Sequence, residues 1–140
     1  MSRKNLMLRI IIALLATFAI YWFAFRTDPK VAALNQAIEQ QASPALKAYP
    51  YKFRVLSLKH GVAEMSTPRS EAMPVTLMIG TIDPSLAGKD QTDPDFVAAE
   101  KQIGALQAEA RQIVVSQPGV KQVTWKLDED WLSEHNISTP

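Results

Sequence analysis

The sequence predicts an α+β domain that follows one N-terminal transmembrane helix, with elements in the order α-β-β-β-α-β. Three observations support this. Ile10–Phe25 is apolar and uncharged, two later segments space their apolar residues three and four apart, and others alternate apolar with polar residues. Helices packed on one face of a small, mostly antiparallel sheet account for such patterns. The chain then divides into a tail (1–5), a membrane anchor (6–26) and one domain (27–140).

The anchor reaches the length needed to cross a bilayer, about 20 residues, when residues 6–9 are included. Arg9 and Arg26 stand at the two ends of the uncharged stretch, where long basic side chains extend to the lipid headgroups. Tyr21 and Trp22 are aromatic residues of the kind enriched at membrane interfaces. We therefore predict that these four side chains lie at the membrane interface.

Flanking charge predicts the orientation of the anchor. Three basic residues precede the apolar stretch, whereas two basic residues and Asp28 follow it. The positive-inside rule then places the tail in the cytoplasm and the domain in the periplasm of a bacterial inner membrane. A cleaved signal peptide is the alternative. Its best cleavage site, Thr17–Ala19, would leave the apolar Ile20–Phe23 on the mature terminus, which favours an uncleaved signal anchor.

Composition narrows the function classes. Residues 27–140 hold 11 basic residues and all 14 acidic ones, a net charge of −3. A mildly acidic domain lacks the basic surface that nucleic acid requires. The chain has no cysteine, which excludes disulfides, thiolate nucleophiles and cysteine-based metal sites. No pattern in the sequence indicates a cofactor.

The first half of the domain is predicted to be a helix followed by three strands. Asp28 and Pro29 suit the cap and first turn of a helix, and Ser43–Pro44 interrupts that helix and restarts a short turn. The strands are then predicted at three segments. These are Tyr51–Leu58, Val62–Met65 and the strongly apolar Pro74–Ile82, which we expect to be the central strand.

The second half is predicted to be a helix, a strand and a short last helix. After the polar loop Asp83–Asp95, either Thr92 or Asp93 would cap the helix. Its apolar stripe is predicted to be a core face and consists of Phe96, Ala99, Ile103, Leu106, Ala110 and Ile113. Pro118–Gly119 ends this helix, Val120–Leu127 alternates as a strand, and Asp128–His135 is the last helix.

No catalytic site is predicted. His60 and His135 are predicted to be exposed polar residues, because a general base needs an orienting carboxylate and a cleft that a sequence does not show. No serine lies in a G-x-S-x-G turn. Asp90, Asp93 and Asp95 are weak candidates for a calcium site. Asx-turns and helix capping explain the same aspartates without a metal, so we predict none.

Two tryptophans follow the long helix. Trp125 lies in the last strand, where alternation predicts that it belongs to the core. Trp131 lies just beyond that strand. Packing under the last helix and contact with a partner protein are both open for Trp131.

The segment ARQIVVSQPGVKQVTWKL, Ala110–Leu127, resembles the helix–PGV–strand passage of BON domains. Those are small αββαβ modules of bacterial envelope proteins, and the resemblance implies association with membranes or phospholipid. The chain departs from the family in its long Asp83–Asp95 loop and in having fewer glycines, and no site residue is carried over. As a whole it resembles uncharacterised single-pass inner-membrane proteins of proteobacteria.

Three functions are therefore expected, in decreasing order. The first is a membrane-anchored periplasmic interaction domain, an accessory or scaffold subunit of an envelope complex with a membrane-protein partner. The second is a BON-like lipid- or ligand-binding module. The third is an enzyme that uses His60 or the Asp83–Asp95 loop.

Overall fold

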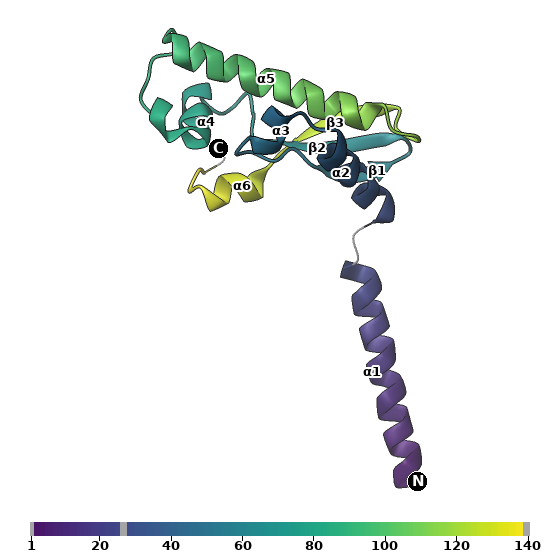
Figure 1. Cartoon of the computed structure of the whole chain (residues 1–140). Helices are drawn as coiled ribbons and strands as arrows, with labels where there is room; N and C mark the ends of the chain where they lie inside the picture. The colour runs from purple at the N-terminus through teal and green to yellow at the C-terminus, as the bar shows by residue number, and fades with distance from the viewer. Residues whose placement is uncertain (1, 26–27, 139–140) are drawn as a thin grey trace.

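The computed structural model describes residues 2–25 and 28–138. It has one N-terminal apolar helix and a mixed α+β domain built on a three-stranded sheet (Figure 1). The elements are α1 (Arg3–Phe25), α2 (Pro29–Gln41), α3 (Pro44–Ala48), β1 (Val55–Lys59), β2 (Val62–Thr67), α4 (Val75–Ile82), the 3-10 helix η1 (Pro84–Leu86), α5 (Pro94–Val115), β3 (Gln122–Leu127) and α6 (Glu129–Glu134).

Helix α1 is long and apolar enough to cross a membrane or to serve as a signal anchor. Its candidate span is Arg3–Phe23, with a mean hydropathy of 2.1, and none of it is buried in the domain. Figure 1 shows α1 extending away from the domain. The predicted interface residues Arg9, Tyr21 and Trp22 lie within α1, whereas Arg26 lies outside the described residues.

The sheet has the order β1-β2-β3. Strands β1 and β2 form an antiparallel hairpin that turns at His60–Gly61, and both turn residues have positive φ, which glycine adopts without steric cost. Strand β3 runs parallel to β2, with Ala63 opposite Val123. A parallel neighbour requires a crossover, and α4 and α5 provide it.

The core lies between the sheet and the helices that cover one of its faces (Figure 1). The predicted stripe of α5 is buried apart from the half-buried Ala99, so it is a core face. Tyr51, Phe53 and Val55 are all buried and alternate with more exposed residues, as predicted. Only Val55 belongs to β1, however, because the segment before it pairs with β2 through a single residue, Arg54.

The predicted third strand, Pro74–Ile82, is wrong, because Val75–Ile82 is helix α4 and Pro74 is its N-cap. A short apolar run has no periodicity that distinguishes a buried strand from a buried helix. As a helix, α4 buries Met78 and Ile79 and leaves Leu77 exposed. Pro74 precedes its first turn, where the missing N–H of proline costs no hydrogen bond.

Candidate docking groove

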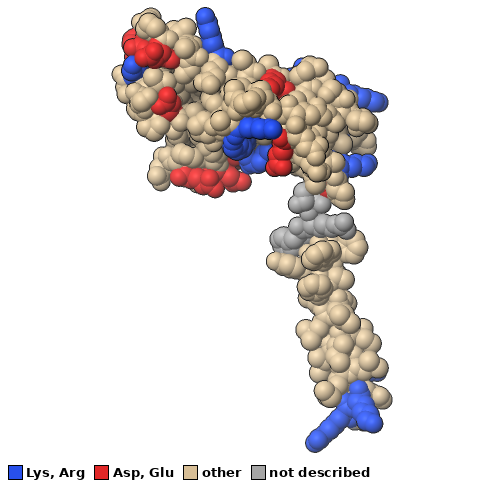
Figure 2. Space-filling view, in the orientation of Figure 1, with Lys and Arg blue, Asp and Glu red and all other residues tan. Residues whose placement is uncertain are grey.

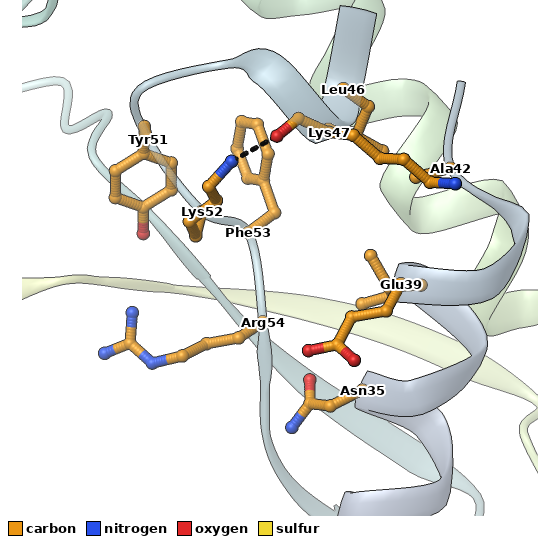
Figure 3. Close-up of a pocket in the computed structure, with 10 residues that line it drawn as sticks. Asn35, Glu39, Ala42, Leu46, Lys47, Tyr51, Lys52, Phe53 and Arg54 are labelled. Carbon is orange, nitrogen blue, oxygen red and sulfur yellow. Dashed lines mark hydrogen bonds between the residues drawn. The ribbon is translucent and has the colours of Figure 1, made fainter. Parts of the chain in front are cut away.

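One hollow of the domain is a groove lined by α2, α3 and residues 51–54. It encloses about 500 Å³ (Figure 3). Its floor and walls are mainly apolar and include Ile38, Ala42, Leu46 and Phe53. The other lining residues carry polar groups and are Asn35, Glu39, Lys47, Tyr51, Lys52 and Arg54. We call these ten residues the groove.

Asn35 fixes the strand that forms one wall of the groove. Its side-chain amide donates to the Val55 carbonyl (3.1 Å), and its carbonyl oxygen accepts from the Val55 N–H (2.7 Å). Val55 is buried on the edge strand β1, and a helix side chain therefore provides the hydrogen bonds that its N–H and C=O would otherwise make with another strand. The wall therefore keeps a fixed distance from α2.

A second set of hydrogen bonds holds α3 above the groove. Ser43 caps α3, since its hydroxyl accepts from the Leu46 N–H at 3.2 Å. Glu109 of α5 accepts from both the backbone N–H and the hydroxyl of Ser43, each at 2.9 Å. The break between α2 and α3 is thus tied to the long helix.

The rim of the groove carries charge of both signs. Figure 3 shows the Glu39 carboxylate on the α2 side, with the side chains of Lys52 and Arg54 across the opening. The Lys52 ammonium donates to the Lys47 carbonyl. Among the described residues, neither Glu39 nor the Lys47 ammonium takes part in a hydrogen bond or ion pair within the domain. These two charges are therefore available to a bound molecule.

Asp128 joins the groove to the C-terminal helix α6. Arg54 donates to both of its carboxylate oxygens, at 2.6 and 3.2 Å, and the Tyr51 hydroxyl donates to Oδ2 at 2.9 Å. The carboxylate also caps α6 by accepting from the Trp131 N–H at 3.2 Å. The side chain of Asp128 is only 2% exposed, so this cluster fixes α6 beside the groove.

The hydrogen bonds of this cluster determine its protonation states. Burial alone would raise the pKa of Asp128, but the donors around the carboxylate outweigh burial and hold that pKa below its ordinary value. Burial raises the pKa of the Tyr51 hydroxyl, and the adjacent Asp128 carboxylate adds to this rise. The carboxylate also raises the pKa of Arg54. The cluster is therefore an ionised carboxylate held by a neutral phenol and a guanidinium.

Four aromatic rings run through the same region in edge-to-face contact. Tyr51 lies 5.4 Å from Trp131 and 4.9 Å from Phe53, and Phe53 lies 6.2 Å from Trp125, all as ring centroid distances. Trp131 is half-buried and packs against the core. Trp131 is therefore a residue of α6 that packs onto the core, and part of its side chain stays exposed.

The two histidines lie apart from the groove. His60 is exposed in the β1–β2 turn, and the hollow beside it includes no carboxylate among the described residues that line it. His135 is exposed at the end of α6, where its ring lies 4.4 Å from that of Trp131 and its Nδ1 lies 2.7 Å from the Trp131 carbonyl. Within the described residues, neither histidine ring forms a hydrogen bond or ion pair with a carboxylate.

The aspartates at and just before the start of α5 form hydrogen bonds and ion pairs with residues close to them in the chain. Asp90 accepts from the N–H and the hydroxyl of Thr92, and these hydrogen bonds lower its pKa. Asp93 caps α5, which resolves the alternative of a Thr92 cap. Lys89 forms ion pairs with Asp93 (3.7 Å) and Asp95 (3.2 Å). Within the described part of the chain, no group of three histidine or acidic side chains could hold a metal ion.

Sequence reasoning missed both Asn35 and the role of Asp128. An asparagine on a helix gives no local sign that it will bind a strand 20 residues later. Asp128 was predicted only as the first residue of the last helix, and its partners Tyr51 and Arg54 lie more than 70 residues away. Comparison with known proteins adds no functional residue, because no protein-family model, curated protein or solved structure matches the chain.

Proposed function

We propose that this chain is a membrane-anchored interaction domain, an accessory or scaffold subunit that docks a protein partner in the groove. The groove carries the proposal, because it combines an apolar floor with a charged rim. Protein interfaces have this anatomy, with apolar and aromatic contacts at the centre and polar contacts around them. The charge bias around α1 orients the domain toward the periplasm of a bacterial inner membrane.

The properties of the groove suit docking more than catalysis. Its one phenol, Tyr51, donates to Asp128 and has a raised pKa, so it is a poor nucleophile. Asn35 holds the strand beside the groove through Val55, and Glu109 holds the start of α3 through Ser43. A rigid receptor surface loses little conformational entropy when it binds a partner.

Site-specific photocrosslinking of the full-length chain in native membranes tests this function. A photoreactive residue in place of the exposed Glu39 should give a discrete protein adduct, and Lys52→Glu should reduce its yield. A photoreactive residue in place of Ala105, which is exposed on α5 and lies outside the groove, is the matched control. No adduct at Glu39, or the same adduct from Ala105, would contradict the proposal.

A BON-like lipid- or ligand-binding module is the second candidate. The order α2-β1-β2-α5-β3, with α3, α4 and η1 inserted and α6 added, supports it, as does the apolar floor of the groove. Purified full-length protein would then carry a defined small molecule through detergent exchange. Photolabelling at Glu39 would yield a lipid adduct and no protein adduct.

A further inference from the structure

The surface of α6 is acidic. Glu129, Asp130 and Glu134 are exposed on this six-residue helix, and within the described residues none of them takes part in an ion pair or hydrogen bond through its carboxylate. Ile137, which is half-buried, lines the same shallow hollow as Glu129 and Asp130. We call Glu129, Asp130, Glu134 and Ile137 the acidic patch.

The rim of the groove is mainly basic and lies on the same side of the domain. Its lining includes three basic residues, Lys47, Lys52 and Arg54, and one acidic residue, Glu39. Figure 2 shows Lys and Arg side chains gathered near the middle of the visible face, with Asp and Glu side chains at its lower edge over α6. Arg54 is already engaged by Asp128, so Lys47 and Lys52 are the cations best able to meet new carboxylates.

The two surfaces are held in a fixed relation to each other. Asp128 connects α6 to Tyr51 and Arg54, and both of these residues line the groove. The aromatic contact between Trp131 and Tyr51 adds a second link. Two adjoining patches of opposite charge on one face are self-complementary, because a two-fold axis between them places each patch against its opposite in a second copy.

We propose that the groove receives α6 of a second copy of this chain, so that two copies form a symmetric dimer with two equivalent groove–α6 contacts. The inference rests on the proposed docking function of the groove and names its occupant. Carboxylates of the acidic patch meet Lys47 and Lys52, and Ile137 faces the apolar floor. Copies anchored by α1 in one membrane share an orientation and a raised effective concentration, which favours such pairing.

Two charge-reversed variants of the full-length chain in mild detergent test the dimer. One carries Lys47→Glu with Lys52→Glu, and the other carries Asp130→Lys with Glu134→Lys. Each places like charges at both contacts of its own dimer, so each should weaken self-association by at least about 10-fold in sedimentation or native mass spectrometry. An equimolar mixture should restore the dimer, since each contact in the mixed dimer again joins opposite charges.

A control variant with Lys101→Glu and Arg111→Glu carries the same charge change as the first variant on exposed positions of α5, and it should associate like the wild type. Restoration by mixing shows that both reversed chains are folded. Wild-type dimerisation should also weaken in 0.5 M salt, where charge attraction is screened to about 4–5 Å.

A monomeric wild type, an undiminished dimer in either reversed variant, or a mixture that stays monomeric would overturn the dimer. The photocrosslinking experiment at Glu39 distinguishes failure of the dimer from failure of the docking function. A monomeric chain that still forms a protein adduct from Glu39 has a different partner in its groove. A monomeric chain without that adduct contradicts both proposals.

Discussion

Replacing Asp128 with alanine should destabilise the domain more than any exposed substitution on α6. The carboxylate accepts from the Tyr51 hydroxyl, from the Arg54 guanidinium and from the Trp131 N–H. In Asp128→Ala the phenol and the N–H lose their acceptor inside the domain. The side chain of Arg54 is 43% exposed and can be hydrated.

The expected cost follows from these partners. A buried hydroxyl left without its acceptor costs about 1–3 kcal/mol, and loss of an N-cap costs about 1 kcal/mol. The half-exposed Arg54 pair adds about 0.5 kcal/mol, because solvent screens it. The free energy of unfolding should therefore fall by about 3 kcal/mol. Asp128→Asn keeps an acceptor and a capping group and should lose about half as much.

Denaturant unfolding of the full-length chain in detergent, followed by tryptophan fluorescence, measures this loss. Trp131 and Trp125 both lie near the cluster and report on it. Glu134→Ala removes an exposed carboxylate from the same helix and should change the free energy of unfolding by less than about 0.5 kcal/mol. If Asp128→Ala were no more damaging than Glu134→Ala, the cluster would not hold α6 to the sheet.

Three further predictions concern pH, the edge strand and two glycines. The pKa of Asp128 is lower in the folded than in the unfolded chain, so its stabilisation is complete above the unfolded pKa near 3.8 and is lost as pH falls through the folded value. Acid unfolding curves of Asp128→Asn should accordingly be shallower below about pH 4 than those of the wild type. Asn35→Ala leaves the N–H and C=O of the buried Val55 without their hydrogen-bond partner and should lower the free energy of unfolding by about 2–3 kcal/mol. Gln36→Ala, at an exposed position of the same helix, should lower it by less than about 0.5 kcal/mol in the same thermal or denaturant unfolding assay. Gly104→Ala should stabilise α5 by about 0.5–1 kcal/mol, because its added Cβ meets no atom within 4 Å. Gly61→Ala should destabilise the domain by about 1 kcal/mol, because alanine is strained at φ +79°. A gain in stability from both substitutions in the same unfolding assay would contradict the assigned turn.

Signals that act over a few residues were read correctly from the sequence. Asp28 with Pro29 begins α2, and Ser43 with Pro44 begins α3. For α5 the sequence left Thr92 and Asp93 open as the cap, and the structure has Asp93, followed by Pro94. A helix cap involves a side chain and backbone groups two or three residues away, so the sequence contains all of its parts. The stripe of α5 was equally readable, because a long periodic segment has only one apolar face to bury.

The groove could not be predicted in the same way. Its lining residues come from two helices and from residues 51–54. Asp128, near the other end of the chain, accepts a hydrogen bond from Tyr51 in that lining. Each contributing residue has an ordinary local explanation. Only packing brings them together, and one sequence on its own carries no record of which pairs meet.

By itself the sequence determined an apolar N-terminal helix, a mixed α+β domain, and the starts of its main helices, because hydrophobicity, periodicity and capping are local properties. Tertiary structure alone decided that Val75–Ile82 is a helix, in which Met78 and Ile79 are buried, and that the sheet has three strands. It also decided that Asn35 and Asp128 shape a groove. Both outcomes depend on contacts between distant segments, and their energies appear only when those segments exclude water together.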